Sequence, residues 1–240
     1  MSIRSLKSAF YRRLPVLRLP GVRYVFQPDG FQNLLHFLYC RKIKRHNSFT
    51  LQGETYRYFD TYKTWLGERV VEIPIVMEMV RKYSGQDILE IGNVLSNHTQ
   101  FKHDVLDKYD ITKGVINEDV VDFKSKKKYD LIVSISTLEH VGWDERPKDN
   151  MKIIRAIENL KTLIVSRRGT IVITLPIGFN SALDKLLREY MIHFSKQYQL
   201  MRVSKGNEWK EVSWKEVQEV KYNAPFPFAN GLVIGIIEIR

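Results

Sequence analysis

Short apolar runs alternate with polar and amphipathic segments from Asp87 to the end of the chain. Each run has the length of a buried strand and is bounded by turn-forming or charged residues. The strands predicted in this way are 87–91, 103–106, 114–117, 129–135, 169–175, 197–203 and 231–239. This alternation is typical of an α/β fold with a doubly wound, mostly parallel sheet and helices on both faces.

Two helices are predicted from apolar spacing. Asp149–Val165 carries apolar residues at 151, 154, 157, 160 and 164, with Asp149 as a plausible cap and Gly169 just beyond its end. The other helical stretch is 62–83, and we expect Pro74 to separate it into two segments, because proline breaks the hydrogen-bond ladder.

The first 60 residues follow a different pattern. Residues 30–45 have a helical apolar spacing, and Ser48–Phe59 alternates around Gly53 as a small hairpin does. We therefore predict a basic N-terminal extension over residues 1–60, with a helix and a small hairpin, and an α/β domain over residues 61–240.

The net charge of +11 belongs mainly to that extension. Residues 1–50 hold ten basic residues and one acid, a balance of 10 − 1 = +9, which leaves 11 − 9 = +2 for the remainder. Basic residues at 41–45 suit the last turn of a helix. Alternatively, residues 1–45 form an amphipathic surface that contacts anionic membrane or phosphate, and the Arg-rich first 25 residues also resemble a transit peptide.

The composition is that of an ordinary globular protein, with 44% apolar and 27% charged residues among 240. No apolar run approaches the roughly 20 residues that span a bilayer. The single Cys40 excludes an internal disulfide, and no His, Cys and carboxylate spacing indicates a metal site. We expect a cytoplasmic protein, in peripheral contact with membrane if the basic surface is used.

Polar residues follow four of the predicted strands, where a doubly wound sheet binds its ligand. These are Glu90 and Gly92, Asp107, Asn117-Glu118-Asp119, and the run from Ser134 to Val141. A carboxylate at Asp107 could accept hydrogen bonds from both hydroxyls of a ribose. The sequence therefore predicts a nucleotide-like ligand at this edge of the sheet.

Several of these segments resemble the class I S-adenosylmethionine-dependent methyltransferases and, among these, the methyltransferase type 11-like proteins. The similar segments are Ile88-Leu89-Glu90-Ile91-Gly92, Asp107, Asp119–Phe123, Tyr129–Ser134 with Leu138-Glu139-His140-Val141, and Gly169–Pro176. The resemblance covers about residues 85–180 and, more loosely, the terminal strands.

That resemblance implies a Rossmann-like sheet of seven strands with the last antiparallel, and S-adenosylmethionine as cofactor. Glu90 and the turn at Gly92 and Asn93 would face its methionine part, Asp107 its ribose, and Asp119 with the Val120 amide its adenine. Ser136 would close over the methionine end.

The chain departs from the family at the first strand end. The usual Gly-x-Gly-x-Gly is here Gly92-Asn93-Val94-Leu95-Ser96, in which only the first glycine is kept. Two interpretations follow: a methyltransferase with an altered cofactor turn, or a non-catalytic binding module that keeps the fold.

His140 is the candidate catalytic residue, because an imidazole can accept a proton from an acceptor hydroxyl or amine near neutral pH. Its alternative role is a structural hydrogen bond to a backbone carbonyl. Trp143, Asn180 and Tyr222 are candidate substrate contacts, because they follow predicted strands or precede the last one.

The acceptor is narrowed by two absent motifs. No Asn/Asp-Pro-Pro-aromatic element follows the fourth strand, which argues against methylation of base amines in nucleic acid. Cys40 lies before the α/β domain, which argues against C5-pyrimidine methylation through a cysteine nucleophile. O- or N-methylation of a small molecule, a sugar or a lipid-linked glycan is what remains. Nucleic acid enters as the alternative of an RNA methyltransferase that uses the basic extension.

Overall fold

The computed structural model describes residues 35, 38, 46–61, 64–99, 102–166 and 168–239. Lys44–Arg240 forms one compact unit of the chain. The other unit, Met1–Ile43, includes only Leu35 and Leu38 among the described residues, both helical and exposed. The rest of the helix predicted over residues 30–45 and the transit-peptide resemblance lie outside the described residues.

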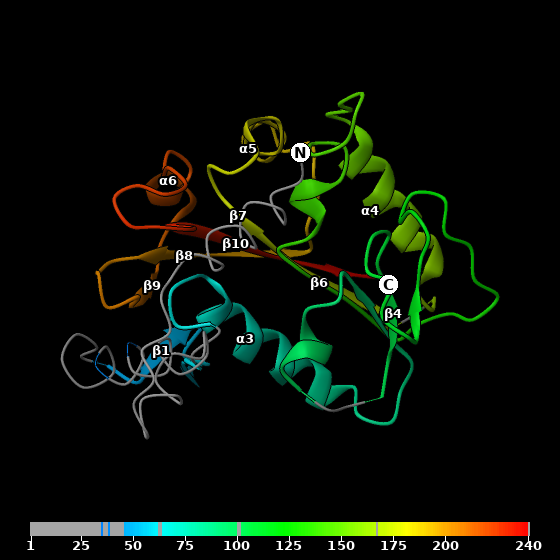
Figure 1. The fold of residues 1–240 in the computed structure, drawn as a ribbon, viewed down its shortest axis with the longest axis horizontal. Helices are drawn as coiled ribbons and strands as arrows, with labels where there is room; N and C mark the ends of the chain where they lie inside the picture. Colours follow the sequence, from blue (N-terminus) through cyan, green and yellow to red (C-terminus); the bar gives the residue numbers. More distant parts are fainter. Residues whose placement is uncertain are drawn as a thin grey trace, which may run out of the picture. The chain divides into compact units, whose positions relative to one another are not determined.

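The described residues of Lys44–Arg240 form a central sheet of eight strands (Figure 1). Its order is β5-β4-β3-β6-β7-β10-β8-β9. The strands are β3 (Ile88–Ile91), β4 (Asp104–Leu106), β5 (Val115–Ile116), β6 (Leu131–Ile135), β7 (Thr170–Pro176), β8 (Lys196–Arg202), β9 (Trp209–Glu211) and β10 (Gly231–Glu238).

Strands β5, β4, β3, β6 and β7 pair in parallel, and β10 runs antiparallel to both of its neighbours. The predicted α/β fold with a mostly parallel sheet and an antiparallel last strand is confirmed. The sheet carries one strand more than the seven expected, because β9 adds an antiparallel edge to β8. With three residues, β9 is too short to show a period in the sequence.

Helices cover both faces of the sheet, as Figure 1 shows with α3 on one side and α4 and α5 on the other. The strand residues that face α4 (Lys152–Leu163) and α5 (Ser181–Arg188) include Leu89, Ile132 and Ile173. Those that face α3 (Arg69–Lys82) include Ile88, Val133 and Val172. Both faces of each central strand are covered, so the residues of these strands are buried on both sides and mostly apolar.

The expectation that Pro74 separates two helical segments is wrong, because α3 continues through it. Proline cannot donate to the carbonyl four residues earlier, which here is the carbonyl of Val70. That carbonyl instead accepts a hydrogen bond of 2.9 Å from the backbone N–H of Phe59. A tertiary contact thus replaces the missing bond of the helix.

The predicted hairpin is present as β1 (Ser48–Leu51) and β2 (Glu54–Arg57). Its Phe49 and Leu51 pack in one apolar cluster with Val71 of α3 and with Leu200 and Trp209 of the sheet. The hairpin therefore belongs to the compact unit. The division of the chain after residue 60 stays a prediction.

Three short helical elements complete the described unit: the 3₁₀ turns η3 (Leu95–Asn97) and η4 (Leu138–His140), and α6 (Trp214–Val217). Within the described residues, every helix is too short or too polar to cross a membrane.

Candidate ligand site at the carboxyl ends of the parallel strands

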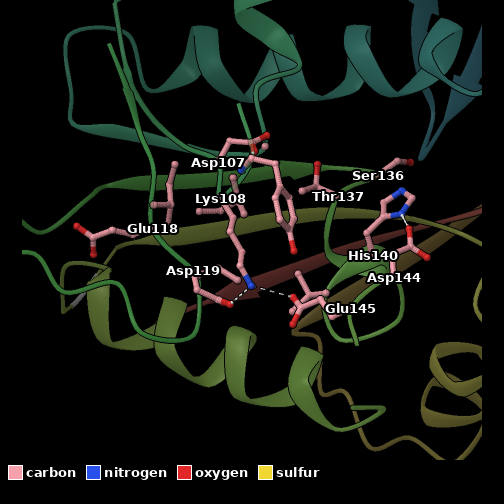
Figure 2. Close-up of a pocket in the computed structure, with 15 residues that line it drawn as sticks. Asp107, Lys108, Glu118, Asp119, Ser136, Thr137, His140, Asp144 and Glu145 are labelled. Atoms are coloured by element: carbon pink, nitrogen blue, oxygen red, sulfur yellow. Dashed lines mark hydrogen bonds and ion pairs between the residues drawn. The ribbon is translucent and has the colours of Figure 1, made fainter. Parts of the chain in front are cut away.

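A cavity of about 450 Å³ lies at the carboxyl ends of β3, β4, β5 and β6 (Figure 2). This volume falls within the range of roughly 300–1,000 Å³ found for small-molecule sites. Its apolar part is formed by Ile91, Leu106, Val120 and Val141. Six of the predicted site residues line it: Gly92, Asp107, Asp119, Val120, Ser136 and His140.

Gly92 makes the turn that opens the cavity. Its φ is +83°, which favours glycine, and its N–H donates to the Leu106 carbonyl at 2.8 Å. A Cβ at this position would collide with the side chain of Thr137, which lines the same cavity. The retained glycine is thus required both by backbone conformation and by a close approach.

Asp107 organises the loop after β4. Its Oδ1 accepts the N–H groups of Tyr109 (2.8 Å) and Asp110 (3.0 Å), and its Oδ2 accepts the N–H of Asn93 at 3.2 Å. Each carboxylate oxygen can accept more than one hydrogen bond. Asp107 therefore joins the β3 and β4 loops and still has acceptor capacity toward the cavity.

Glu90 lies outside the cavity lining. It is fully buried, and its Oε1 accepts the N–H groups of Val94 (2.8 Å) and Leu95 (2.6 Å). Its Oε2 lies 2.6 Å from Nε2 of His103. The carboxylate thus holds the turn that follows Gly92, and it does so from inside the fold.

Asn93, also predicted as a cofactor contact, is directed away from the cavity. Its Nδ2 donates to Asp110 at 2.8 Å, and its side-chain oxygen accepts from the Ser96 hydroxyl. The turn at positions 94–97, where the family has glycines, is here closed by side-chain hydrogen bonds.

Two lysines hold Asp119 at the opposite wall. Lys108 Nζ lies 2.8 Å from its Oδ2 and 3.5 Å from Glu145, and Figure 2 shows this side chain reaching across the cavity. Lys152 Nζ lies 2.5 Å from both Asp119 and Glu145. Burial acts to raise the pKa of Asp119, but hydrogen bonds from Lys108, Lys152 and the Val121 N–H lower this pKa to about 2.

The β6–η4 turn forms the remaining wall. Ser136 has a φ of +36°, and its hydroxyl donates to the buried carboxylate of Glu72. His140 Nδ1 lies 2.6 Å from Asp144 Oδ2, so it donates to that carboxylate (Figure 2). Its Nε2 lies 3.6 Å from Glu139 Oε1. The imidazole is half-exposed, with Nε2 as its proton-accepting atom.

The three predicted substrate residues do not line this cavity. Trp143 is covered by Lys148, whose Nζ lies 3.7 Å from the ring centroid. Asn180 is buried and caps α5, accepting from Ala182 and Leu183 and donating to the Glu139 carbonyl at 2.8 Å. Tyr222 packs edge-on against Phe179, which packs in turn against His140.

Three residues that were not predicted from the sequence also line the cavity: Lys108, Tyr109 and Thr137. Thr137 lies within the segment that carries the resemblance, one position after Ser136. Lys108 and Tyr109 directly follow the predicted ribose contact, in a loop without periodicity. In such a loop, the charge of a side chain does not indicate the direction in which the side chain points.

A comparison with protein-family models and one with curated proteins found no match. Solved structures with a similar fold include NodS, an N-methyltransferase of Bradyrhizobium japonicum. It is 13% identical, with a TM-score of 0.44 over 72% of this chain and 96% of that chain.

An S-adenosylmethionine-dependent methyltransferase of Clostridium acetobutylicum is 9% identical, with a TM-score of 0.39 over 75% of this chain and 92% of that one. The sugar N-methyltransferase KedS8 of a Streptoalloteichus species is 10% identical, with a TM-score of 0.37 over 69% and 86% of the two chains. A ligand is therefore inferred from the residues that line the cavity.

Proposed function

We propose that this chain is a methyltransferase that binds S-adenosylmethionine and methylates O or N of a small molecule, a sugar or a lipid-linked glycan. The observation that carries the proposal is the cavity itself. It lies at the carboxyl ends of the parallel strands, and it brings Gly92, Asp107 and Asp119 together from three loops.

The lining suits the parts of such a cofactor. The Gly92 turn leaves room where a Cβ would clash, and Asp107 has acceptor capacity for a pair of hydroxyls. Asp119, ionised because its pKa is about 2, would accept from an exocyclic amine, beside the apolar Val120. Lys108 would have to leave Asp119 for this contact to form.

When bound, S-adenosylmethionine supplies an electrophilic methyl group on a sulfonium. The chain would align an acceptor with it, exclude water and take up the proton that the acceptor loses. His140 is our candidate for the last task, because its Nδ1 lies 2.6 Å from the Asp144 carboxylate, which leaves Nε2 to accept a proton. The carboxylates of Asp144 and Glu139 flank the ring and would stabilise the imidazolium.

A non-catalytic binding module is the second candidate. It is favoured by Glu90, whose carboxylate is committed to the turn and to His103, and by Lys108, which occupies Asp119. A module of this kind would keep the sheet and the cavity but bind no methyl donor.

Calorimetric titration of the whole protein with S-adenosylhomocysteine separates the two. We expect binding that weakens about tenfold in Asp107→Asn, the loss typical of a charge-assisted hydrogen bond. Asp104→Asn is the matched control, because Asp104 begins the same strand at the end far from the cavity and pairs with Lys127.

Absence of binding at high concentration would rule out the methyltransferase proposal and leave the binding module. Equal affinities of Asp107→Asn and the unaltered chain would mean that S-adenosylhomocysteine binds elsewhere.

A further inference from the structure

Lys108 is the single lysine or arginine among the described residues that line the cavity, and the proposed binding of a methyl donor leaves its position unexplained. Its ammonium group lies 2.8 Å from Asp119 Oδ2 and 3.5 Å from Glu145 Oε1. The same lining holds five carboxylates: Asp107, Glu118, Asp119, Asp144 and Glu145. An acidic cavity is thus crossed by a cation that belongs to the protein.

The Lys108 side chain passes between the two carboxylates that we propose as ligand contacts. Lys108 follows Asp107 directly in the loop after β4, and its ammonium group reaches Asp119 in the loop after β5. Figure 2 shows the side chain extended between these two residues. A nucleoside with its ribose at Asp107 and its base at Asp119 needs the same space. In this position, Lys108 and such a ligand exclude one another.

The Lys108 side chain can leave without a change in the loop that carries it. Asp107 Oδ1 accepts the N–H groups of Tyr109 and Asp110, which fixes the backbone on either side of Lys108. Release therefore requires only rotation about the bonds of the side chain itself, a fast motion for an exposed residue. The side chain is 38% exposed, so water can solvate the released ammonium group.

Lys152 keeps the two carboxylates paired when Lys108 leaves. Its Nζ lies 2.5 Å from both Asp119 and Glu145, and its side chain is only 13% exposed. Asp119 Oδ1 also accepts the N–H of Val121 at 3.1 Å. Because neither carboxylate becomes an unpaired charge, release of Lys108 avoids the large cost of breaking a buried ion pair.

The contact between Lys108 and Asp119 is not governed by pH near neutrality. The hydrogen bond to Asp119 raises the pKa of Lys108 above its usual value, and the pKa of Asp119 is about 2. Both groups are therefore charged at any pH near neutrality. What can separate them is another hydrogen-bond donor that competes for Asp119.

We propose that the Lys108 side chain is a displaceable strap, which competes with the nucleoside part of the ligand for Asp119 and thereby sets the affinity of the cavity. This inference rests on the proposed methyltransferase function and adds a residue that determines affinity at the same site. A ligand displaces the strap when it offers Asp119 a donor in exchange, as the exocyclic amine of adenine does. The apparent affinity is lowered in proportion to the fraction of protein in which the strap is open.

The alternative is that Lys108 stays in place and donates to the bound ligand. In that case its positive charge would strengthen binding, whereas a strap weakens binding. Removal of the charge therefore changes the affinity in opposite directions under the two alternatives. The path of the side chain through the space between Asp107 and Asp119 favours the strap.

The test is calorimetric titration of the whole protein and of Lys108→Met with S-adenosylhomocysteine. Methionine is unbranched and of similar length, and it lacks the charge. We expect Lys108→Met to bind about fivefold more tightly, a factor at the upper end for a solvent-accessible ion pair. Lys108→Arg keeps the charge and the reach, and it should bind no more tightly than the unaltered protein.

Lys152→Met is the matched contrast, because Lys152 pairs with the same two carboxylates from outside the described lining of the cavity. It should not bind S-adenosylhomocysteine more tightly, since its loss opens no space for the ligand. Lys161→Met is the neutral control, because Lys161 lies on α4 and pairs with Glu158. Thermal unfolding of each variant verifies that it is folded.

The strap is refuted if folded Lys108→Met binds S-adenosylhomocysteine no more tightly than the unaltered protein, or if Lys108→Arg or Lys152→Met gains as much affinity. Binding to the unaltered protein without a gain in Lys108→Met refutes the strap alone. Binding to Lys108→Met but not to the unaltered protein supports the strap and refutes the proposed function. Absence of binding to every variant refutes both.

Discussion

Gly92 combines two constraints at the scale of a single residue. Its backbone has a φ of +83°, and the space where a Cβ would lie is taken by Thr137. Either constraint alone would favour glycine, but only the second concerns the cavity. The retention of this one glycine, among the three of the family pattern, therefore has a local physical reason.

We predict that Gly92→Ala weakens S-adenosylhomocysteine binding and lowers the free energy of unfolding. The positive φ costs about 1–2 kcal/mol, and the collision with Thr137 adds about 1–3 kcal/mol. Gly85→Ala is the matched control, because Gly85 has a φ of +82° and open space around its Cβ position. Chemical denaturation and calorimetry measure both effects. Equal destabilisation by the two variants would contradict the role of Thr137.

Glu139 allows a prediction about pH. It is faced by Glu68, Glu72, Arg69 and His140, and burial raises its pKa above the usual value of 4.5. The folded state then binds more protons than the unfolded chain between these two pKa values, so this residue lowers stability as the pH rises above about 4.5.

Replacement by glutamine removes that titration. We therefore predict that Glu139→Gln gains in stability relative to the unaltered protein as the pH is raised from about 4.5 toward neutrality. Urea denaturation of both proteins at several pH values measures the difference. A constant difference over this range would mean that Glu139 has an ordinary pKa.

The candidate site could be predicted in part. Asp107 and Asp119 follow apolar runs, and the position of a residue after a strand fixes the edge of the sheet at which it lies. Glu90 occupies a similar position, but its carboxylate is used by His103, thirteen residues later in a loop. The position of Lys108 in the cavity could not be predicted for a related reason. The direction of its side chain depends on ion pairs with Asp119 and Glu145, which come from other loops.

At the scale of elements, the turn after β3 replaces the glycine-rich loop that the resemblance implies. In place of bare backbone, η3 is held by Glu90, which accepts the N–H groups of Val94 and Leu95 and pairs with His103. The turn is thus fixed by a buried carboxylate. This geometry gives Gly92 a defined position without further glycines.

We predict that Glu90→Gln destabilises the protein by about 1.5–3 kcal/mol, the range for a buried hydrogen bond to a charged group. It should also weaken S-adenosylhomocysteine binding, because η3 positions the Gly92 turn. Glu78→Gln is the control, since Glu78 forms exposed ion pairs on α3 that contribute about 0–1 kcal/mol. Unchanged stability of Glu90→Gln in chemical denaturation would show that the turn is held by other contacts.

The central strands β3, β6 and β7 were predictable because both faces of the sheet are covered there, which makes each of them a mostly apolar run. The continuity of α3 through Pro74 was not predictable. It depends on a hydrogen bond from the Phe59 N–H to the Val70 carbonyl, which is a contact from outside the helix. The helix α5 was also missed. Its eight residues begin at Ser181, directly after the cap Asn180, whose side chain also donates to the Glu139 carbonyl in the neighbouring η4 turn.

At the scale of the whole molecule, charge and cavity belong to different parts of the sequence. Residues 1–43 hold eight basic residues and one acid, so 8 − 1 = +7 of the net charge of +11, and 11 − 7 = +4 remains for Lys44–Arg240. Every residue that lines the cavity lies between Ile91 and Glu145. Ligand binding and attraction to anionic surfaces should therefore be separable by deletion.

We predict that the whole chain sediments with vesicles containing phosphatidylserine at low salt, and that deletion of residues 1–43 abolishes this while leaving S-adenosylhomocysteine affinity unchanged. Each basic residue near an anionic membrane contributes about 1 kcal/mol, and the attraction is screened within about 8 Å at physiological salt. Vesicles of phosphatidylcholine alone are the control.

RNA titrations of the same two proteins test RNA as the alternative partner, since phosphate binding by the extension would give RNA affinity a steep salt dependence. Vesicle binding that survives the deletion would place the membrane contact in Lys44–Arg240, where the charge of +4 would have to account for it.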